Sequence, residues 1–187
     1  NEIIKNLMGK LSLKNTHAVP RINKIVLNMG LGAEALEKKK LESCIKDVAA
    51  IAGQQPVITK FRKSISNFKS RKGSNAGLKV TLRNDRMYEF IDRLVNIALP
   101  RIKDFKGLKD SSCDSFGNFS FGIKEHIIFP EINFDKVETI RGLDVTIVTT
   151  SQNKENTIHL LKEFNFPIIK DTSKKKKKFK KIVIKED

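Results

Sequence analysis

The fold is decided by residues 78–83, which read Leu-Lys-Val-Thr-Leu-Arg. Two leucines and a valine alternate here with two bases and a threonine. Because successive side chains of a β-strand point to opposite faces of the sheet, this pattern predicts a strand with one buried face and one polar, basic face.

A second alternating stretch, residues 57–62, lies shortly upstream and predicts another strand. The segment between the two strands, Lys63–Gly77, is rich in Ser, Asn, Lys and Gly. Its length predicts a protruding loop rather than a tight turn. Two strands joined in this way are antiparallel.

Further out, the hydrophobic spacing predicts two more strands and four helices. The strands are residues 22–29 and 143–148; the helices carry the apolar stripes at 4–11, 41–52, 87–98 and 158–164. Gly53 is expected to end the second helix, Asn84 or Asp85 to cap the third, and Ser151 to Asn153 to cap the last. Residues 106–122 are expected to be irregular. This order of elements favours an α+β two-layer sandwich, a mainly antiparallel sheet with helices on one face.

The other face of the predicted sheet is the informative one. On three strands its polar positions carry only positive charge and hydrogen-bonding groups, namely Lys24, Asn28, Lys60, Lys79, Thr81 and Arg83. A solvated face would mix both signs of charge, so a nucleic-acid phosphate backbone is the natural counterpart.

The charge balance supports the same interpretation. The 187 residues contain 37 Lys and Arg against 21 Asp and Glu, a net charge of +16. From Val48 to Asn84 there are eight bases and no acid, and the end of the chain, 170–187, has nine bases against three acids. Such an excess predicts a polyanionic partner. We expect one domain over residues 1–169 and a Lys-rich extension over 170–187, which contacts RNA or is merely solvated.

Several classes of function lack their signatures. The chain has no phosphate-binding GxxxxGK[ST] loop, no GxGxxG and no HExxH, and Cys44 and Cys113 stand far apart. Glu125 and His126 are adjacent, but no third catalytic partner is evident. The longest apolar run, Val48–Ala52, is far too short to cross a membrane. We therefore expect no cofactor, no metal and no membrane partner.

Six stretches resemble a known family, the bacterial-type large-subunit ribosomal protein family L-five. They occur in the family's order and spacing, and the resemblance covers about residues 19–167. The stretches are Val19–Gly32, Gly53–Lys60, Lys79–Arg83, Leu99–Leu108, Ile127–Ile132 and Arg141–Ile147.

The resemblance implies a structural protein of the large ribosomal subunit that binds 5S rRNA in the central protuberance. A non-ribosomal α+β RNA-binding module and, less favoured, an enzyme stay open as alternatives. The implied 5S-binding residues are Lys24, Asn28, Gln54, Thr59, Lys60, Arg62, Lys63, Lys79, Thr81 and Arg83. The implied contacts to peptidyl-site tRNA come from Lys69, Arg71, Lys72, Ser74 and Asn75 in the loop. By the same resemblance, the tip of the loop is expected at Ser74-Asn75-Ala76. Large-subunit rRNA, neighbouring central-protuberance proteins and, through about 109–122, a protein of the small-subunit head are the other implied partners.

The composition also bears on the source of the ribosome. Lys (29) far exceeds Arg (8), and Ile (22) and Asn (14) are abundant, as AT-rich coding would produce. This bias favours a mitochondrial ribosome, with the bacterial cytoplasm as the alternative.

Overall fold

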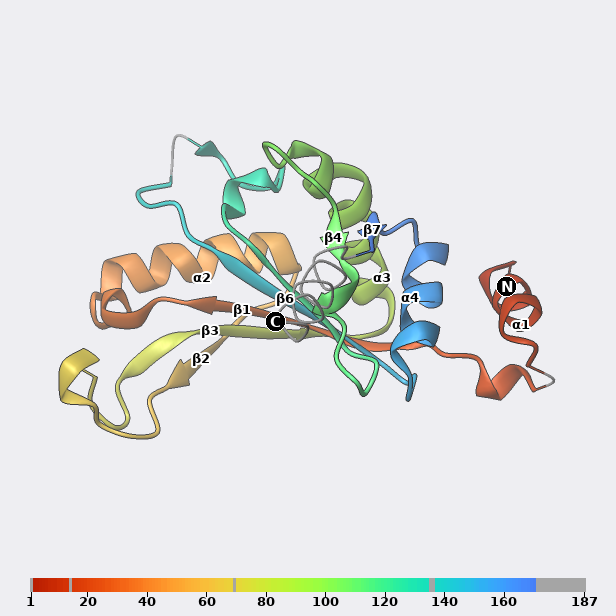
Figure 1. Cartoon of the computed structure of the whole chain (residues 1–187). Helices are drawn as coiled ribbons and strands as arrows, with labels where there is room; N and C mark the ends of the chain where they lie inside the picture. Colours follow the sequence, from red (N-terminus) through yellow and green to blue (C-terminus); the bar gives the residue numbers. More distant parts are fainter. Residues whose placement is uncertain (1, 14, 69, 135–136, 171–187) are drawn as a thin grey trace, which may run out of the picture.

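A five-stranded antiparallel sheet forms the framework of the computed structural model, which describes residues 2–13, 15–68, 70–134 and 137–170. The strand order is β2-β3-β1-β6-β5, with β1 in the centre (Figure 1). The strands are β1 (Ile22–Gly30), β2 (Val57–Lys60), β3 (Asn75–Leu82), β5 (Phe119–Ile123) and β6 (Leu143–Thr149). The predicted hairpin of β2 and β3 is confirmed as antiparallel.

Helices cover one face of this sheet. The helices are α1 (Glu2–Leu11), α2 (Lys38–Ala52), α3 (Asn84–Arg93) and α4 (Lys154–Glu163). Figure 1 shows α2 and α3 above the sheet and no helix below its β3–β1 half, while α1 packs against α4 at one end of the molecule. The predicted α+β fold is therefore confirmed. We call the uncovered side the open face.

The core lies between the sheet and the helices. Ile25, Leu27 and Val80 point into it from the two central strands and are almost fully buried. Phe90 of α3 stacks on Phe129 within the same cluster. Burial of each side chain of this size contributes roughly 1.5–3 kcal/mol to the stability of the fold. The apolar positions of the alternating strands are therefore the main reason why the helices pack on this face of the sheet.

Two helix ends depend on left-handed backbone. Gly53 ends α2 with φ 63°, as the sequence predicts. The sequence also predicts Asn84 or Asp85 as the cap of α3, but the capping position is Arg83, which makes no side-chain capping hydrogen bond. Asn84 is instead the first residue of the helix, and its φ is 51° at the sharp turn from β3. Asn tolerates this conformation better than most residues, which explains its presence there.

The third predicted helix is shorter than its apolar stripe. Regular α-helix ends at Arg93; a wider π-type turn follows at Leu94–Ala98 and a 3-10 turn at Leu99–Arg101. Leu94 and Ala98 are nevertheless buried, as the stripe predicts. Pro100, inside the 3-10 turn, cannot donate a helical hydrogen bond, so the chain does not return to regular α-helix after this turn.

The prediction that residues 106–122 are irregular is wrong in two places. β5 begins at Phe119 and pairs with β6, and β4 (Leu108–Lys109) pairs in parallel with β7 (Ile168–Ile169). Both pairings join segments distant in sequence, so local patterns alone do not reveal them. The division between a domain at 1–169 and an extension stays a prediction, because 171–187 lie outside the described residues.

A glycine pair gives a sharp test of this packing. Gly77 and Gly30 are partners across β3 and β1, yet a Cβ at Gly77 would lie 2.4 Å from the Met29 carbonyl oxygen, whereas one at Gly30 would meet nothing within 4 Å. We expect Gly77→Ala to lower the free energy of unfolding by about 1–3 kcal/mol through overpacking. Urea unfolding should show Gly30→Ala close to wild type; equal effects of the two substitutions would contradict the register.

Candidate nucleic-acid interface

The strand register brings the predicted 5S-binding residues of β1 and β3 together on the open face. Asn28 is the partner of Lys79, and Val26 is the partner of Thr81. Lys24 continues the same side of β1, beside Val148 of β6. Lys79 is exposed, and Lys24, Asn28 and Thr81 are half-buried, so all four side chains are accessible from the uncovered side.

The basic side chains of this surface form no ion pair with other described residues. Ion pairs between described residues involve other bases, namely Lys10, Lys40, Arg93 and Arg141, or the imidazole of His126. Lys79 and Arg83 are exposed and take part in none of these pairs. Positive charge that is not neutralised within the described part of the chain is available to an anionic partner.

One predicted residue of the β2 strand is not where simple alternation puts it. Val57 and Thr59 are the partners of Lys79 and Gly77, so these two lie on the open face. The register then shifts, and Lys60 pairs with Asn75. Thr59 therefore lies on the open face with Lys79, whereas Lys60 is exposed at the point where the strand register is irregular.

The open face is also less uniform than predicted. The sequence indicates only bases and hydrogen-bonding groups on three strands, but β6 completes the face and adds Asp144. Asp144 is the partner of Asn28, whose amide nitrogen lies 3.4 Å from the carboxylate. A negative charge thus lies in the same row of the sheet as Lys79.

Gln54, Arg62 and Lys63 flank the sheet rather than lie in it. Gln54 follows the left-handed Gly53 at the end of α2 and is half-buried, while Arg62 and Lys63 are exposed just beyond β2. Arg62 and Lys63 lie at the base of the β2–β3 hairpin, so the structure groups them with the loop as much as with the open face.

The hairpin loop is held by its own hydrogen bonds. The Phe61 amide donates to the Ser74 carbonyl at 2.9 Å, and Ile65 and Ser70 exchange two backbone hydrogen bonds at 3.1 and 3.2 Å. The Lys72 amide donates to Ser64 Oγ at 2.9 Å. The arms therefore extend well beyond β2 and β3, and the hairpin protrudes from the sheet (Figure 1).

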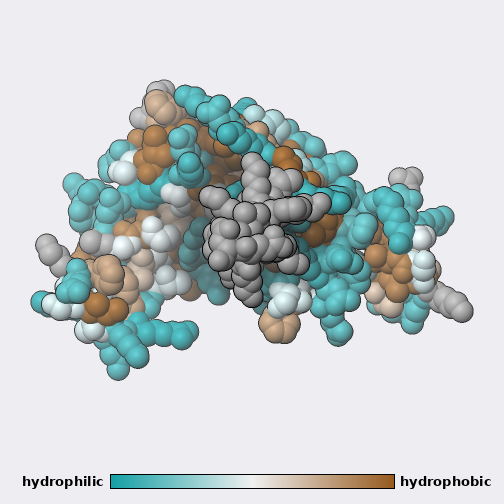
Figure 2. All heavy atoms as spheres, viewed as in Figure 1, coloured by the Kyte–Doolittle hydropathy of each residue, from teal (hydrophilic) through white to brown (hydrophobic). Residues whose placement is uncertain are grey.

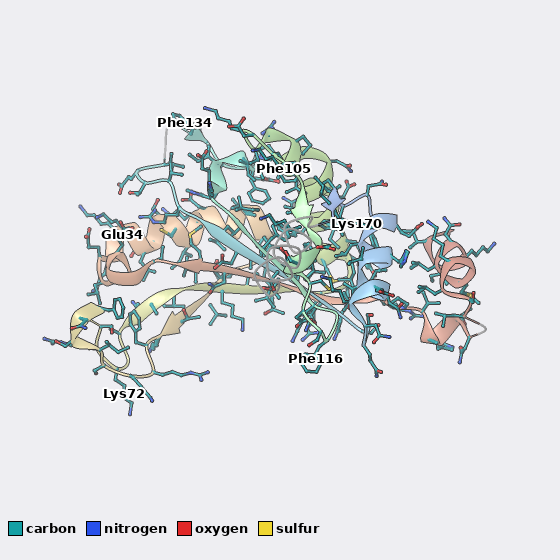
Figure 3. The ribbon with its side chains drawn as sticks, in the orientation of Figure 1. Glu34, Lys72, Phe105, Phe116, Phe134 and Lys170 are labelled. Atoms are coloured by element: carbon teal, nitrogen blue, oxygen red, sulfur yellow. The ribbon has the colours of Figure 1, made fainter. Side chains whose placement is uncertain are left out.

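This pairing corrects the expected tip. Asn75 and Ala76 begin β3, and Ser74 Oγ donates to the Arg71 carbonyl at 2.6 Å, so the tip is the 3-10 turn at Ser66–Phe68. Arg71 and Lys72 are exposed, and hydrophilic side chains, Lys72 among them, project from this end (Figure 2 and Figure 3). Lys69 lies outside the described residues.

A second loop, residues 110–118, projects on the open-face side of the sheet (Figure 1). Phe116 is 75% exposed on it, on the opposite side from Phe134 (Figure 3). The loop is anchored at Gly117, whose carbonyl accepts hydrogen bonds from Thr149 Oγ1 at 2.7 Å and Thr157 Oγ1 at 2.9 Å. Gly117 has φ 81°, and a Cβ there would lie 2.6 Å from the Ser151 carbonyl oxygen, so only glycine fits.

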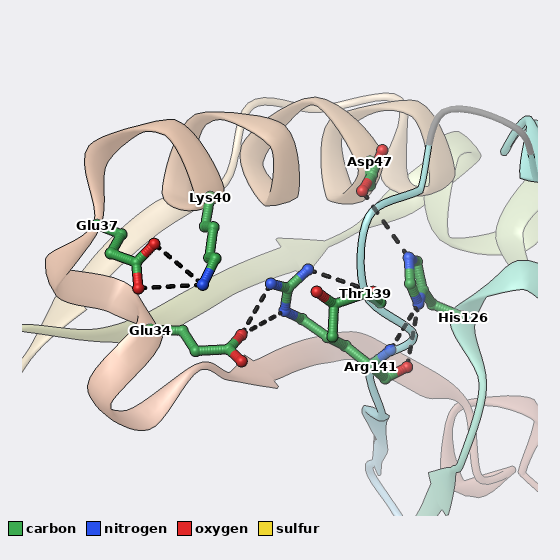
Figure 4. Close-up of polar contacts among 7 residues, drawn as sticks. All are labelled: Glu34, Glu37, Lys40, Asp47, His126, Thr139 and Arg141. Atoms are coloured by element: carbon green, nitrogen blue, oxygen red, sulfur yellow. Dashed lines mark hydrogen bonds and ion pairs between the residues drawn. The ribbon is translucent and has the colours of Figure 1, made fainter.

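His126 is a buried residue that connects three segments of the fold. It is 1% exposed; its Nε2 lies 3.8 Å from an Asp47 carboxylate oxygen, and its Nδ1 meets the backbone of Arg141 (Figure 4). The Arg141 guanidinium donates to Glu34 at 2.8 and 3.1 Å. These contacts fasten the start of β6 to α2 and its preceding turn. Burial raises the pKa of Asp47, which the neighbouring His126 and Arg141 only partly oppose.

Both cysteines are buried, and burial raises the pKa of both the Cys44 and the Cys113 thiol. A protonated thiol is a poor nucleophile. Within the described residues, no group of three or more His, Cys, Asp or Glu could hold a metal ion. Among the described helices, none is long and apolar enough to span a membrane.

Comparisons with known proteins identify the family of the chain. Residues 15–71 match the family model "Ribosomal protein L5", and residues 75–168 match the model of the C-terminus of the same ribosomal family. The chain belongs to the ribosomal protein L5 family.

Two relatives show how far the similarity extends. The large ribosomal subunit protein uL5 of Pelagibacter ubique is 56% identical over 169 residues, 90% of this chain and 92% of its own length. Its counterpart in Dichelobacter nodosus is 51% identical over 166 residues, 89% and 93% respectively. The L5 family consists of structural ribosomal proteins, not enzymes. Both relatives are bacterial, so the preference for a mitochondrial ribosome is not supported.

The anchored 110–118 loop gives a pH test. Burial raises the pKa of Asp114, but hydrogen bonds from Asn118 and Phe116 outweigh it and hold the pKa of this carboxyl below its ordinary value. A carboxyl with a depressed pKa stabilises the fold above its unfolded pKa of about 3.9, and this stabilisation is lost as the pH falls through the folded pKa. Asp114→Ala should therefore lower the melting temperature at pH 7.

The pH dependence distinguishes a charge effect from a loss of packing. We expect the difference in melting temperature between wild type and Asp114→Ala to shrink steadily below about pH 4, as wild-type Asp114 becomes protonated. A difference that is the same at neutral pH and in acid would show that the carboxylate charge is not what holds the loop.

Proposed function

We propose that this L5-family chain is a structural constituent of the large ribosomal subunit that binds 5S rRNA through its open face. The observation that carries the proposal is the positive charge of Lys79, unpaired among the described residues, beside the polar groups of Asn28 and Thr81 on the side that no helix covers. The exposed Arg83 follows directly after β3 in extended backbone and adds a second such charge. Phosphate contacts position an RNA, and the interleaved amide and hydroxyl groups add hydrogen bonds to sugar and base. Thr59, Lys60, Arg62 and Lys63 extend this surface toward the hairpin loop, and Gln54 extends it from the end of α2, ahead of β2.

The hairpin has a separate role in the proposal, contact with peptidyl-site tRNA. It protrudes from the sheet and carries Arg71 and Lys72, with Lys69 predicted to join them. Ser74 and Asn75 lie nearer the sheet than the tip does. Ser74 donates a hydrogen bond to the Arg71 carbonyl and Asn75 pairs with Lys60, so both stabilise the arms of the hairpin. A hydrogen-bonded hairpin with exposed basic side chains suits a partner that binds the ribosome transiently and is then released.

The remaining partners are assigned to other surfaces. The 110–118 loop, with Phe116 exposed on it, is the part of segment 109–122 best placed to meet a protein of the small-subunit head. Large-subunit rRNA and neighbouring central-protuberance proteins complete the proposed environment. The Lys-rich extension is proposed to add RNA contacts, and most of it lies outside the described residues.

Lys79→Ala together with Arg83→Ala tests the open face. Each substitution removes a charged hydrogen-bond donor, worth roughly 1.5–3 kcal/mol, without touching the buried side of β3. We expect 5S rRNA affinity to fall at least tenfold and the dependence on salt to become shallower, by about 0.7–0.9 in the logarithmic slope per lost phosphate contact. Filter binding across a salt series measures both.

The control lies on the same strand. Val80 is 2% exposed on the opposite face, so Val80→Ala should cost roughly 2 kcal/mol of stability while the folded protein binds 5S rRNA normally. Unchanged affinity in a folded Lys79→Ala/Arg83→Ala variant would reject the open face as the 5S rRNA site.

Replacing Lys69, Arg71 and Lys72 together by Ala tests the hairpin. The segment contributes little to the core, so the melting temperature and 5S rRNA affinity should stay close to wild type. Ribosomes containing the variant should retain peptidyl-site tRNA less well in a dissociation assay. Loss of 5S rRNA binding with normal tRNA retention would reverse the proposed division between hairpin and open face.

A further inference from the structure

The open face holds one carboxylate among its basic side chains. Of the strand residues that the register places on this face, Asp144 is the acidic one, and it is exposed. A carboxylate beside an RNA backbone repels phosphates, so at this position it weakens indiscriminate binding.

The surroundings of Asp144 leave it open to a ligand. On one side Asn28 donates its amide to Oδ2 at 3.4 Å; on the other side the partner residue is Gly122, where a Cβ would lie 3.3 Å from Oδ1. No ion pair between described residues neutralises the carboxylate. Glycine at position 122 therefore keeps Oδ1 uncovered, while Asn28 holds the other oxygen.

The pair offers acceptors to N–H donors. Because the Asn28 side-chain nitrogen donates to Asp144, its carbonyl oxygen and the free carboxylate oxygen are left as acceptors. Phosphates and riboses present no N–H group, whereas bases do. The Watson–Crick edge of guanine presents two adjacent N–H donors, which match the two oxygens of a carboxylate, since Oδ2 keeps a second lone pair while it accepts from Asn28. Adenine and cytosine each present one amino group on this edge, and uracil presents one imino group.

We infer that Asp144, steadied by Asn28, binds the Watson–Crick edge of an unpaired guanine in the RNA that lies on the open face. Lys79, the next residue in the same row, holds the backbone of that RNA. The inference deepens and rests on the proposed binding of 5S rRNA. The basic side chains of the open face supply affinity, and Asp144 discriminates between nucleobases. Such a contact is typical of RNA recognition, where exposed bases of loops are read on their edges.

Kethoxal footprinting tests the contact directly, because this reagent modifies N1 and N2 of unpaired guanines. Wild-type protein bound to 5S rRNA should protect at least one guanine that regains reactivity in Asp144→Asn at saturating protein. Lys79→Ala, also at saturation, should keep that protection. Glu42→Gln removes an exposed acid from α2, on the covered side, and should leave the footprint unchanged.

Competition binding gives the second readout. Asp144→Asn should lower the ratio of affinities for 5S rRNA and a scrambled RNA of equal length by about tenfold, the size of a good base contact. An unchanged ratio with both affinities raised would show charge repulsion alone, and persistence of every guanine protection would show no base contact; either result overturns the inference. Failure of wild-type protein to prefer 5S rRNA would instead reject the proposed function.

Discussion

Antiparallel pairing of β1 with β3 on one side and β6 on the other is the constraint on which the rest of the structure depends. These two pairings fix which residues of the three central strands face the helices. A slip of one residue would exchange the faces, burying Lys79 and exposing Val80. The close contact of Gly77 with the backbone of Met29 and Gly30 leaves little room for such a slip.

The distribution of acids follows from this arrangement. Glu34, Glu37, Glu131 and Glu163 are used in ion pairs that connect helices, turns and loops around the core. Lys79 and Arg83 receive no such partner among the described residues. The molecule thus uses these carboxylates in its own architecture and leaves positive charge on the open face, where the bases repel one another until a polyanion binds.

Both projecting loops are organised before any partner arrives. The hairpin closes on itself through backbone hydrogen bonds from Phe61 to Ser74, and the 110–118 loop is tied at Asp114 and Gly117. A preorganised loop loses less conformational entropy on binding than a flexible one. The contacts of Asp47, His126 and Arg141 serve a similar purpose behind the sheet, since they fix the approach of the chain to β6.

The sequence by itself determined the central strands, the hairpin, the basic side of β3 and the family. Each of these rests on a local signal: alternation with a period of two, a Ser/Asn/Lys/Gly-rich connection, or a short motif such as Arg141–Ile147. Only the tertiary structure decided the partnership of Asn28 with Asp144, the burial of His126 against Asp47, the place of β5 and the tip of the hairpin. The physical reason is that these features depend on which distant segments pair: Asn28 and Asp144 are 116 residues apart, and nothing in either neighbourhood specifies the other.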